Sequence, residues 1–399
     1  MKTKSLYIIV AITLLIQLYV LFWRPVSHGP NLRQVPFAQL PSWDKTDTKK
    51  SLIAFQVSCK AFLRQDPDRA VGSQYIELTA KDWHPACRAA SQMTIYSKES
   101  ARTFFQTWFT PVEFYDEKPV GGLFTGYYMP SLHGSLTQTK RYNVPIYGLP
   151  QTMVTINLGL FASDLMYRKA VGRVDGHKVV PFYTREEINS GAIAANTPVI
   201  AWVDNPIDRL TLEIEGSGIV KLTDGTQMAV GYAGENGATY TSIARVLIDQ
   251  GVMTRDNASM QHIYRYLTEH PEQIDLVLNQ NKSFVFFTKL KQDVALGSQG
   301  VALTPGYSLA VDRKWIPMGV PMWLDTTRPD HLSDQQKSFH RLMIAQDTGG
   351  AIRGPVRGDV YWGEGDRATE IAGRMKNTGH YWLLLPRHTI ERLNDKLKV

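Results

Sequence analysis

Cysteine is scarce in this chain, because only Cys59 and Cys87 occur among its 399 residues. Two well-separated cysteines do not form the closely spaced pairs that metal and redox sites use. The ten histidines are scattered and also lack metal-ligand spacing. We therefore predict no metal site and no cofactor.

Motifs for phosphate and nucleic-acid binding are absent as well. The sequence holds no G-x-x-x-x-G-K-[ST] loop and no internal repeat, and Gly349-Gly350 is not part of a dinucleotide fingerprint. The formal net charge is +7, yet no dense Lys/Arg cluster is interleaved with aromatic residues. We predict no nucleic-acid partner, and the positive charge favours acidic polymers or membrane surfaces instead.

Charge is missing from residues 5–23, which follow Lys2 and Lys4. As a helix this segment would rise roughly 28 Å, about the thickness of a bilayer core. We predict a signal anchor over residues 1–24, with the N-terminus in the cytoplasm and the rest of the chain beyond the membrane. A cleaved signal peptide is the alternative, but bulky residues occupy the place of a small-residue cleavage site.

The segment after the anchor, residues 25–47, contains four prolines and little periodicity, which predicts an extended linker. Amphipathic helices are expected over 49–63 and 97–109. Outside the cytoplasm, a disulfide between Cys59 and Cys87 is the simple expectation. Its loop of nearly thirty residues would stabilise the fold by roughly 3–4 kcal/mol.

An apolar run at residues 122–130 predicts a strand that carries Tyr127 and Tyr128. A tyrosine ring stacks on a sugar ring and its hydroxyl donates a hydrogen bond, so the pair is a candidate sugar platform. Packing of both rings in a sheet core is the alternative. Downstream, residues 134–287 predict a separate α+β unit, in which apolar residues alternate over 210–214 as a half-buried strand.

Two aspartates near the C-terminus lie at the ends of short apolar runs bounded by glycine. Asp347 ends the run that begins at residue 341, and Asp359 opens the next run. Such runs predict buried strands, and the glycines let a ligand approach the backbone. Two carboxylates in one turn system indicate acid/base chemistry, with an ordinary turn or cap role for both as the alternative.

Eight motifs occur in the same order as in one family of bacterial cell-wall enzymes. They are FTGYY (124–128), GSG (216–218), YAGENG (232–237), NKSFVFF (281–287), SLAVD (308–312), IPMG (316–319), DTGGAIRG (347–354) and GDVYWG (358–363). The sequence resembles the membrane-bound lytic transglycosylase A family over roughly residues 48–390. Its last part resembles the three-aspartate domain, whose aspartates would here be Asp312, Asp347 and Asp359.

The resemblance implies a mainly β fold with helices. A six-stranded double-psi β-barrel would be built from residues 48–133 together with 288–399, and residues 134–287 would be inserted as a second β-rich domain. A groove between the two domains would hold a glycan strand. With the N-terminal transmembrane helix, we predict a single-pass inner-membrane protein with a periplasmic catalytic domain.

The resemblance also implies a peptidoglycan lytic transglycosylase. The family cleaves the β-1,4 bond from N-acetylmuramic acid to N-acetylglucosamine without water and leaves a 1,6-anhydromuramic end. The catalytic acid of the family corresponds to Asp359. One carboxylate can be sufficient for this reaction, because the nucleophile is the tethered C6 hydroxyl of the substrate itself.

Asp359 is predicted to donate a proton to the leaving oxygen and then to accept one from the C6 hydroxyl, which requires a raised pKa. Asp347 is the candidate neighbour that raises this pKa, and holding the turn through backbone N–H groups is the alternative. Asp312 is predicted to be a mainly structural, supporting acid. The predicted substrate contacts are Thr125, Gly126, Tyr127, Glu215, Gly216, Ser217, Gly218, Asn236 and Arg353.

Some positions depart from the family pattern or have a simpler interpretation. Glu215 stands where members of the family often carry glutamine, and Glu235 stands where they carry lysine. Arg353 would hold a muramic-acid carboxylate or peptide, whereas an exposed charge is the more common case for an arginine in a loop.

Two other functions are consistent with parts of the sequence. The Asp-Thr-Gly turn at 347–349 is also an aspartic-protease motif, but it occurs once, so a protease would require a homodimer. In a non-catalytic peptidoglycan-binding module, the aspartates would only shape the groove. Partners among cell-wall synthesis or division proteins, and the choice between chain-end and internal cleavage, are not indicated by these patterns.

Overall fold

The computed structural model describes residues 31–93, 97–165, 168–255, 257–291, 294–333 and 335–397. The predicted anchor and residues 25–30 of the predicted linker lie outside these residues. Within the described ranges, no helix is long and apolar enough to cross a membrane.

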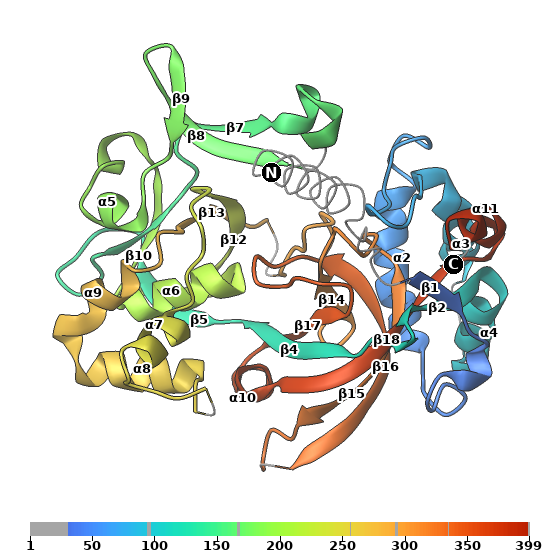
Figure 1. Cartoon of the computed structure of the whole chain (residues 1–399). Helices are drawn as coiled ribbons and strands as arrows, with labels where there is room; N and C mark the ends of the chain where they lie inside the picture. Colours follow the sequence, from blue (N-terminus) through green and yellow to red (C-terminus); the bar gives the residue numbers. More distant parts are fainter. Residues whose placement is uncertain are drawn as a thin grey trace, which may run out of the picture.

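Six strands close into a barrel at the centre of the molecule (Figure 1). Their order around the ring is β18 (Lys376–Pro386), β15 (Pro321–Pro329), β16 (Gln336–Asp347), β14 (Ser308–Val311), β17 (Arg357–Glu364) and β4 (Gly122–Met129), which pairs with β18 again. The pairs β14–β16 and β17–β4 are parallel, and the others are antiparallel. A ring of six strands is what the resemblance implied.

The open edge of β18 continues the sheet through β2 (Phe109–Asp116), which pairs with β1 (Asn31–Gln34) and β3 (Lys118–Pro119). Leu32, Val35 and Trp43 are buried in the main core, and the Trp43 ring packs edge-on against Trp323 of the barrel at 5.0 Å. The prediction of an extended linker is therefore wrong for residues 31–47. Sparse apolar residues in this segment find their partners only in distant parts of the chain, so local periodicity did not reveal them.

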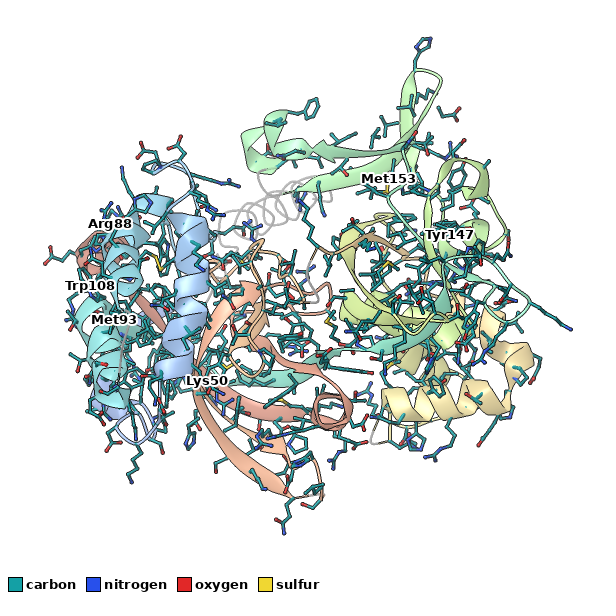
Figure 2. The ribbon with its side chains drawn as sticks, turned by 180° about the vertical axis from the view of Figure 1, so that it is seen from behind. Lys50, Arg88, Met93, Trp108, Tyr147 and Met153 are labelled. Carbon is teal, nitrogen blue, oxygen red and sulfur yellow. A yellow bond between two sulfur atoms is a disulfide. The ribbon has the colours of Figure 1, made fainter. Side chains whose placement is uncertain are left out.

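Helices cover the barrel on the side away from the second sheet (Figure 1). They are α2 (Lys49–Phe62), α3 (Ala80–Gln92), α4 (Lys98–Trp108) and α11 (Ile390–Leu397). Helix α10 (Asp366–Arg374) lies at the other end of the barrel, toward the second unit. The predicted disulfide is confirmed, since Cys59 of α2 is bonded to Cys87 of α3. Seen from behind in Figure 2, the labelled Arg88, Met93 and Trp108 mark this helical side, and Tyr147 and Met153 mark the opposite side.

The second unit is built on a six-stranded sheet. Its order is β13 (Val285–Lys289), β12 (Gln227–Glu235), β11 (Ser217–Leu222), β5 (Ser131–Ser135), β10 (Val199–Val203) and β6 (Val144–Tyr147). Around it lie α5 (Arg185–Asn189), α6 (Pro206–Glu215), α7 (Ile243–Asp249), α8 (Met260–Glu269) and α9 (Ile274–Leu278). A three-stranded sheet of β7 (Met153–Asn157), β8 (Lys169–Asp175) and β9 (Lys178–Pro181) projects beyond it (Figure 1). Short 3-10 turns occupy Phe37–Gln39, Leu158–Leu160, Ser163–Leu165, Ala194–Asn196, Pro271–Gln273 and Arg387–Thr389.

The strand predicted over residues 210–214 is instead the C-terminal half of helix α6. Asn205 caps this helix, because its Oδ1 accepts a hydrogen bond from the Ile207 N–H, and Pro206 occupies the first turn. Gly216 ends it in the left-handed conformation, with a φ of 77°. The start signals lie outside the alternating residues, which by themselves do not distinguish a strand from one buried helix turn.

The two units are joined at Pro130, where β4 of the barrel leads into β5 of the second sheet. A small apolar cluster spans the junction. It consists of Tyr127, Met129, Ala310 and Tyr361 from barrel strands, Ile219 and Ala229 from the second sheet, and Ala295 and Leu303 from the return connection. Two tyrosines of this cluster lie next to the predicted acids. Tyr361 is two residues after Asp359 on β17, and Tyr127 is hydrogen-bonded to Asp347.

Candidate active site

Strand alternation places Asp359 on the outer face of the barrel. Gly358 and Val360 pack inward against the main core, whereas Tyr361 belongs to the junction cluster. On the parallel neighbour β4, Thr125 lies directly opposite Asp359 and donates a hydrogen bond from Oγ1 to Asp359 Oδ1, 2.6 Å away. Asp359 Oδ2 has no hydrogen-bond partner within the described residues.

The surroundings of Asp359 favour its protonated form. Burial raises the pKa of Asp359 to about 6, and the charge of Asp347 acts in the same direction. The hydrogen bond from Thr125 and the charge of Arg357 act against these effects by stabilising the carboxylate. The result is a carboxyl group that both holds and releases a proton near neutral pH.

Arg357 was missed by the sequence analysis. Its Nη2 donates to Thr125 Oγ1 at 3.0 Å, and its Nη1 donates to the carbonyl oxygens of Leu123 and Gly358 at 3.1 and 2.6 Å. Arginine can only donate, so Thr125 accepts from Arg357 and uses its own proton for Asp359. The i, i+2 spacing of Arg357 and Asp359 on one strand was the signal that could have identified this group.

Asp347 is fully engaged by the backbone and by neighbouring side chains. Its Oδ1 accepts hydrogen bonds from the N–H and hydroxyl of Ser298, at 2.9 and 2.8 Å, and from Thr348 N–H at 2.8 Å. Its Oδ2 accepts one from the Tyr127 hydroxyl at 2.8 Å. Burial nevertheless raises the pKa of Asp347. This geometry suits the turn-holding role and also leaves Asp347 near enough to influence Asp359.

Asp312 is buried and accepts hydrogen bonds from the N–H groups of Lys314 and Gly354, at 3.0 and 2.9 Å. It thereby ties the start of the turn after β14 to the end of the loop after β16. Arg353 lies 3.8 Å from Asp312 Oδ1, and its side chain is 68% exposed. The contacts of Asp312 are those of a structural residue.

Glu215, in the second unit, reaches strand β4, the strand that carries Thr125. Its Oε2 accepts a hydrogen bond from the Tyr128 N–H at 3.0 Å. Burial raises the pKa of Glu215 to about 8, and the charge of Asp359 adds to this shift. The structure therefore brings Glu215 and Asp359 within electrostatic range of each other.

Of the glycines predicted to contact substrate, Gly126 and Gly218 are required by close packing and Gly216 by its backbone conformation. A Cβ on Gly126 would lie 2.7 Å from the Trp362 indole nitrogen and 2.9 Å from the Ala372 Cα. A Cβ on Gly218 would lie 2.6 Å from a methyl group of Leu212 and 3.0 Å from the Pro130 carbonyl oxygen. Gly216 is the left-handed cap of α6 and Ser217 is buried at the start of β11. These positions shape the junction, and their substrate contacts stay predictions.

Tyr127 and Asn236 have no free polar group in this structure. The Tyr127 hydroxyl is used by Asp347 and its ring lies on Tyr361, with centroids 5.2 Å apart. Asn236 is 2% exposed, and its amide bonds the backbone at Tyr183, Lys282 and Phe284. The polar groups of both residues are thus used within the protein, and the substrate contact at Asn236 and the sugar platform at Tyr127 stay predictions.

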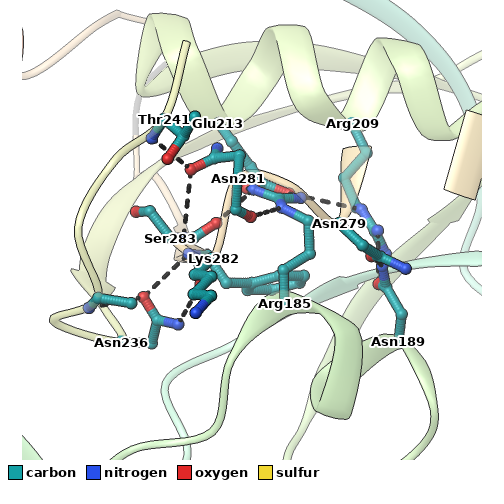
Figure 3. A network of polar contacts seen from close by, with 12 residues as sticks. Arg185, Asn189, Arg209, Glu213, Asn236, Thr241, Asn279, Asn281, Lys282 and Ser283 are labelled. Carbon is teal, nitrogen blue, oxygen red and sulfur yellow. Dashed lines mark hydrogen bonds and ion pairs between the residues drawn. The ribbon is translucent and has the colours of Figure 1, made fainter. Parts of the chain in front are cut away.

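Figure 3 shows the network around Asn236. Arg185 donates to both carboxylate oxygens of Glu213 and to the carbonyl oxygens of Asn281 and Ser283. Asn281 Oδ1 accepts from Thr241 N–H, and Arg209 lies 3.5 Å from Glu213. The network anchors helix α6 two residues before Glu215.

The described residues contain no group of three or more His, Cys, Asp or Glu side chains able to hold a metal ion. An open cavity of about 480 Å³ lies where β4 meets β5, on the α8 and α10 side. It is lined by Tyr128, Asp208, Lys221, Tyr264 and Asp366, among others. Burial raises the pKa of Asp208 in this cavity to about 6.

Known proteins are similar to this chain in sequence and in fold. The MltA specific insert domain matches residues 123–288, and the 3D domain matches residues 307–385. A crystal structure of membrane-bound lytic murein transglycosylase from Agrobacterium tumefaciens is 31% identical, has a TM-score of 0.80, and is matched over 91% of this chain and 99% of that one. This chain belongs to the membrane-bound lytic murein transglycosylase A family.

Other members of the MltA family are similar to this chain to the same degree. MltA from Neisseria gonorrhoeae is 32% identical with a TM-score of 0.74, over 89% of this chain and 92% of that one. Membrane-bound lytic murein transglycosylase A of Vibrio cholerae is 32% identical over 265 residues, which is 66% of this chain and 65% of that protein. The alignment thus spans slightly less than two thirds of this curated MltA. The resemblance that the motifs indicated is confirmed.

Proposed function

We propose that this chain is a peptidoglycan lytic transglycosylase. It cleaves the β-1,4 bond from N-acetylmuramic acid to N-acetylglucosamine without water and leaves a 1,6-anhydromuramic end. Membership of the MltA family supports the substrate and the reaction. The observation that carries the proposal for this chain is Asp359, a carboxyl group with a pKa raised to about 6 and one unbonded oxygen.

In the proposed mechanism Asp359 is the only proton-transfer residue. Protonated Asp359 donates its proton from Oδ2 to the glycosidic oxygen, and the bond from that oxygen to C1 of the muramic acid breaks. The C6 hydroxyl oxygen then bonds to C1, and its proton returns to Asp359. No water is consumed, and the enzyme ends as it began. Because the nucleophile is tethered, proximity supplies much of the rate enhancement.

Thr125 and Arg357 are proposed to act while Asp359 is deprotonated, between its two proton transfers. When Asp359 has lost its proton, the Thr125 hydroxyl and the Arg357 charge stabilise the carboxylate, which makes Asp359 a competent acid. Asp347 is proposed to position the turn through Ser298 and Thr348 and to oppose ionisation of Asp359 by its charge.

The glycan is proposed to lie between the barrel and the inserted domain. The division into residues 48–133 plus 288–399 and an insert of 134–287 is supported by the separate sheets, with residues 31–47 added to the barrel. We also propose that the chain is held at the inner membrane by residues 1–24, with a periplasmic catalytic domain. The uncharged run of residues 5–23 and the disulfide support this placement.

The test digests purified peptidoglycan with the detergent-solubilised full chain, either wild type or Asp359→Asn, and identifies products by mass spectrometry. Wild type should release muropeptides lighter by one water than hydrolytic products, and the variant should lose activity by roughly a thousandfold or more, the scale seen when a sole acid/base group is removed. Hydrolytic products would indicate a glycosidase, and glycan binding without products from wild type would indicate a binding module. Inhibition by pepstatin would indicate the dimeric protease.

A further inference from the structure

Glu215 and Asp359 belong to different units, and both are hydrogen-bonded to strand β4. Asp359 of the barrel is bonded to Thr125, and Glu215 at the end of α6 is bonded to the Tyr128 N–H. Three residues of strand separate these two points, which is about 10 Å. Glycosidases place two carboxyl groups about 5–9.5 Å apart on either side of the sugar that reacts. The separation of the two attachment points on β4 is of the same order.

The charged groups around Glu215 disfavour its carboxylate. It is half-buried at the C-terminal end of a helix, where the helix dipole is negative. The titratable groups that face it are Tyr128 from β4, Asp359 from β17 and Tyr240 from the segment before α7. No cation in the described chain forms an ion pair with it. The nearby Arg185 and Arg209 are bound to Glu213.

The hydrogen bonds of Glu215 determine where its proton resides. Oε2 accepts the Tyr128 N–H, so this oxygen acts as the carbonyl oxygen of the acid. Oε1 has no hydrogen-bond partner within the described residues, so it is the oxygen that would carry the hydroxyl proton of the protonated acid. A neutral carboxylic acid of this kind is a strong donor, whereas its carboxylate can only accept.

We propose that Glu215 is a substrate-positioning residue that acts in its protonated form and donates a hydrogen bond from Oε1 to an uncharged oxygen of the glycan. Acetamido carbonyl and hydroxyl oxygens are the acceptors that an N-acetylated sugar chain offers. This inference rests on the proposed function, because it places the glycan beside Asp359. Loss of the Glu215 proton would replace the donor by a charge facing oxygen lone pairs.

A purely structural role for Glu215 makes a different prediction. Holding the Tyr128 N–H requires only an acceptor, and the acid, the carboxylate and the glutamine amide all supply one. Glycan binding would then not change when Glu215 ionises. The pH dependence of binding therefore distinguishes the two roles, since the pKa of Glu215 is raised to about 8.

The experiment measures binding of chitohexaose, an uncharged probe, by calorimetry between pH 5.5 and 9.5. The Asp359→Asn chain is used so that the probe is not cleaved and Asp359 does not titrate. The Kd should be constant at low pH and rise as Glu215 ionises, approaching tenfold per pH unit for one proton. Removing the charge of Asp359 lowers the pKa of Glu215, so the change should begin somewhat below pH 8.

Three further variants in the Asp359→Asn background complete the design. Glu215→Gln keeps both the acceptor and the donor, so it should bind at pH 9 as it does at pH 6. Glu215→Ala should bind at least tenfold more weakly than its parent at pH 6 and should lose the pH dependence. Asp208→Asn removes another carboxyl group of α6, the one that lines the separate cavity, and should retain the pH dependence.

Three outcomes would count against the inference. A Kd that stays constant through pH 9.5 with Glu215 present, or a Glu215→Ala variant that binds as tightly as its parent at pH 6, would overturn it and leave the proposed function standing. Failure of the Asp359→Asn chain to bind chitohexaose at any pH would overturn both. Thermal denaturation of each variant at pH 6 verifies that the proteins compared are folded.

Discussion

Asp359 owes its character to two residues on the same barrel face. Arg357 donates to Thr125, and Thr125 donates to Asp359 Oδ1, so the hydroxyl is held in the orientation that stabilises a carboxylate. Burial acts in the opposite direction and raises the pKa of Asp359 to about 6. The acid strength at this position is therefore a balance that a single side-chain oxygen can alter.

Replacing Thr125 by valine should test this balance. The carboxylate of Asp359 would lose a hydrogen bond worth roughly 1.5–3 kcal/mol, so its pKa should rise by about one unit or more. Rates of muropeptide release should then fall about tenfold, and the alkaline decline of the pH–rate profile should move to higher pH. Thr125→Ser keeps the hydroxyl and should restore the wild-type profile. A valine variant whose profile is not displaced would show that the hydrogen bond does not tune Asp359.

Helix α6 connects a buried ion network to the candidate site. Glu213, in its last turn, is bound by Arg185 and lies near Arg209, and all three side chains are almost completely buried. Two residues later, Glu215 reaches strand β4 of the barrel. The position of Glu215 therefore depends on contacts made by Glu213, a residue that is almost completely buried (Figure 3).

Removing Arg185 should destabilise the second unit strongly. In Arg185→Met, Glu213 would remain buried with only Arg209 beside it, which costs roughly 3–5 kcal/mol. Arg141→Met is the matched control, because its ion pair with Asp204 is exposed and should contribute less than about 1 kcal/mol. Urea denaturation followed by tryptophan fluorescence measures both. Similar midpoints for the two variants would contradict a structural role for the buried network.

The whole molecule carries several carboxyl groups whose pKa values are raised on folding. Burial is the main cause, and it raises the pKa to about 6 at Asp208 and Asp359 and to about 8 at Glu215. Between their unfolded and folded pKa values these groups bind more protons in the folded state than in the unfolded state. Their contribution to the free energy of unfolding therefore falls as pH rises.

The melting temperature should accordingly decrease as pH rises from about 4 to 8. Asp208 and Asp359 lower the melting temperature as they ionise, up to about pH 6, and Glu215 continues the decrease to about pH 8. Carboxylates with lowered pKa values, such as Asp82, change the melting temperature mainly below this pH range. In the double variant Asp208→Asn/Glu215→Gln the decrease should be smaller by several degrees, as measured by scanning calorimetry. Equal slopes for the two proteins would contradict the raised pKa values.

Much of this protein could be predicted because its signals are local. The ends of the apolar runs located Asp347 and Asp359, the spacing of two cysteines indicated one disulfide, and ordered motifs indicated the family. Each of these signals is carried by neighbouring residues or by residue type alone.

Only the tertiary structure decided which groups are buried and which atoms meet. Residues 31–47 pack onto the barrel, with Asn31–Gln34 in its sheet, because Leu32 and Trp43 find a core contributed by distant strands. Arg357 acts on Asp359 through Thr125, more than 230 positions away along the chain. Tyr127 and Asn236 are satisfied internally because the fold brings acceptors and donors to them. Burial and hydrogen-bond pairing depend on contacts across the chain, and no local pattern encodes them.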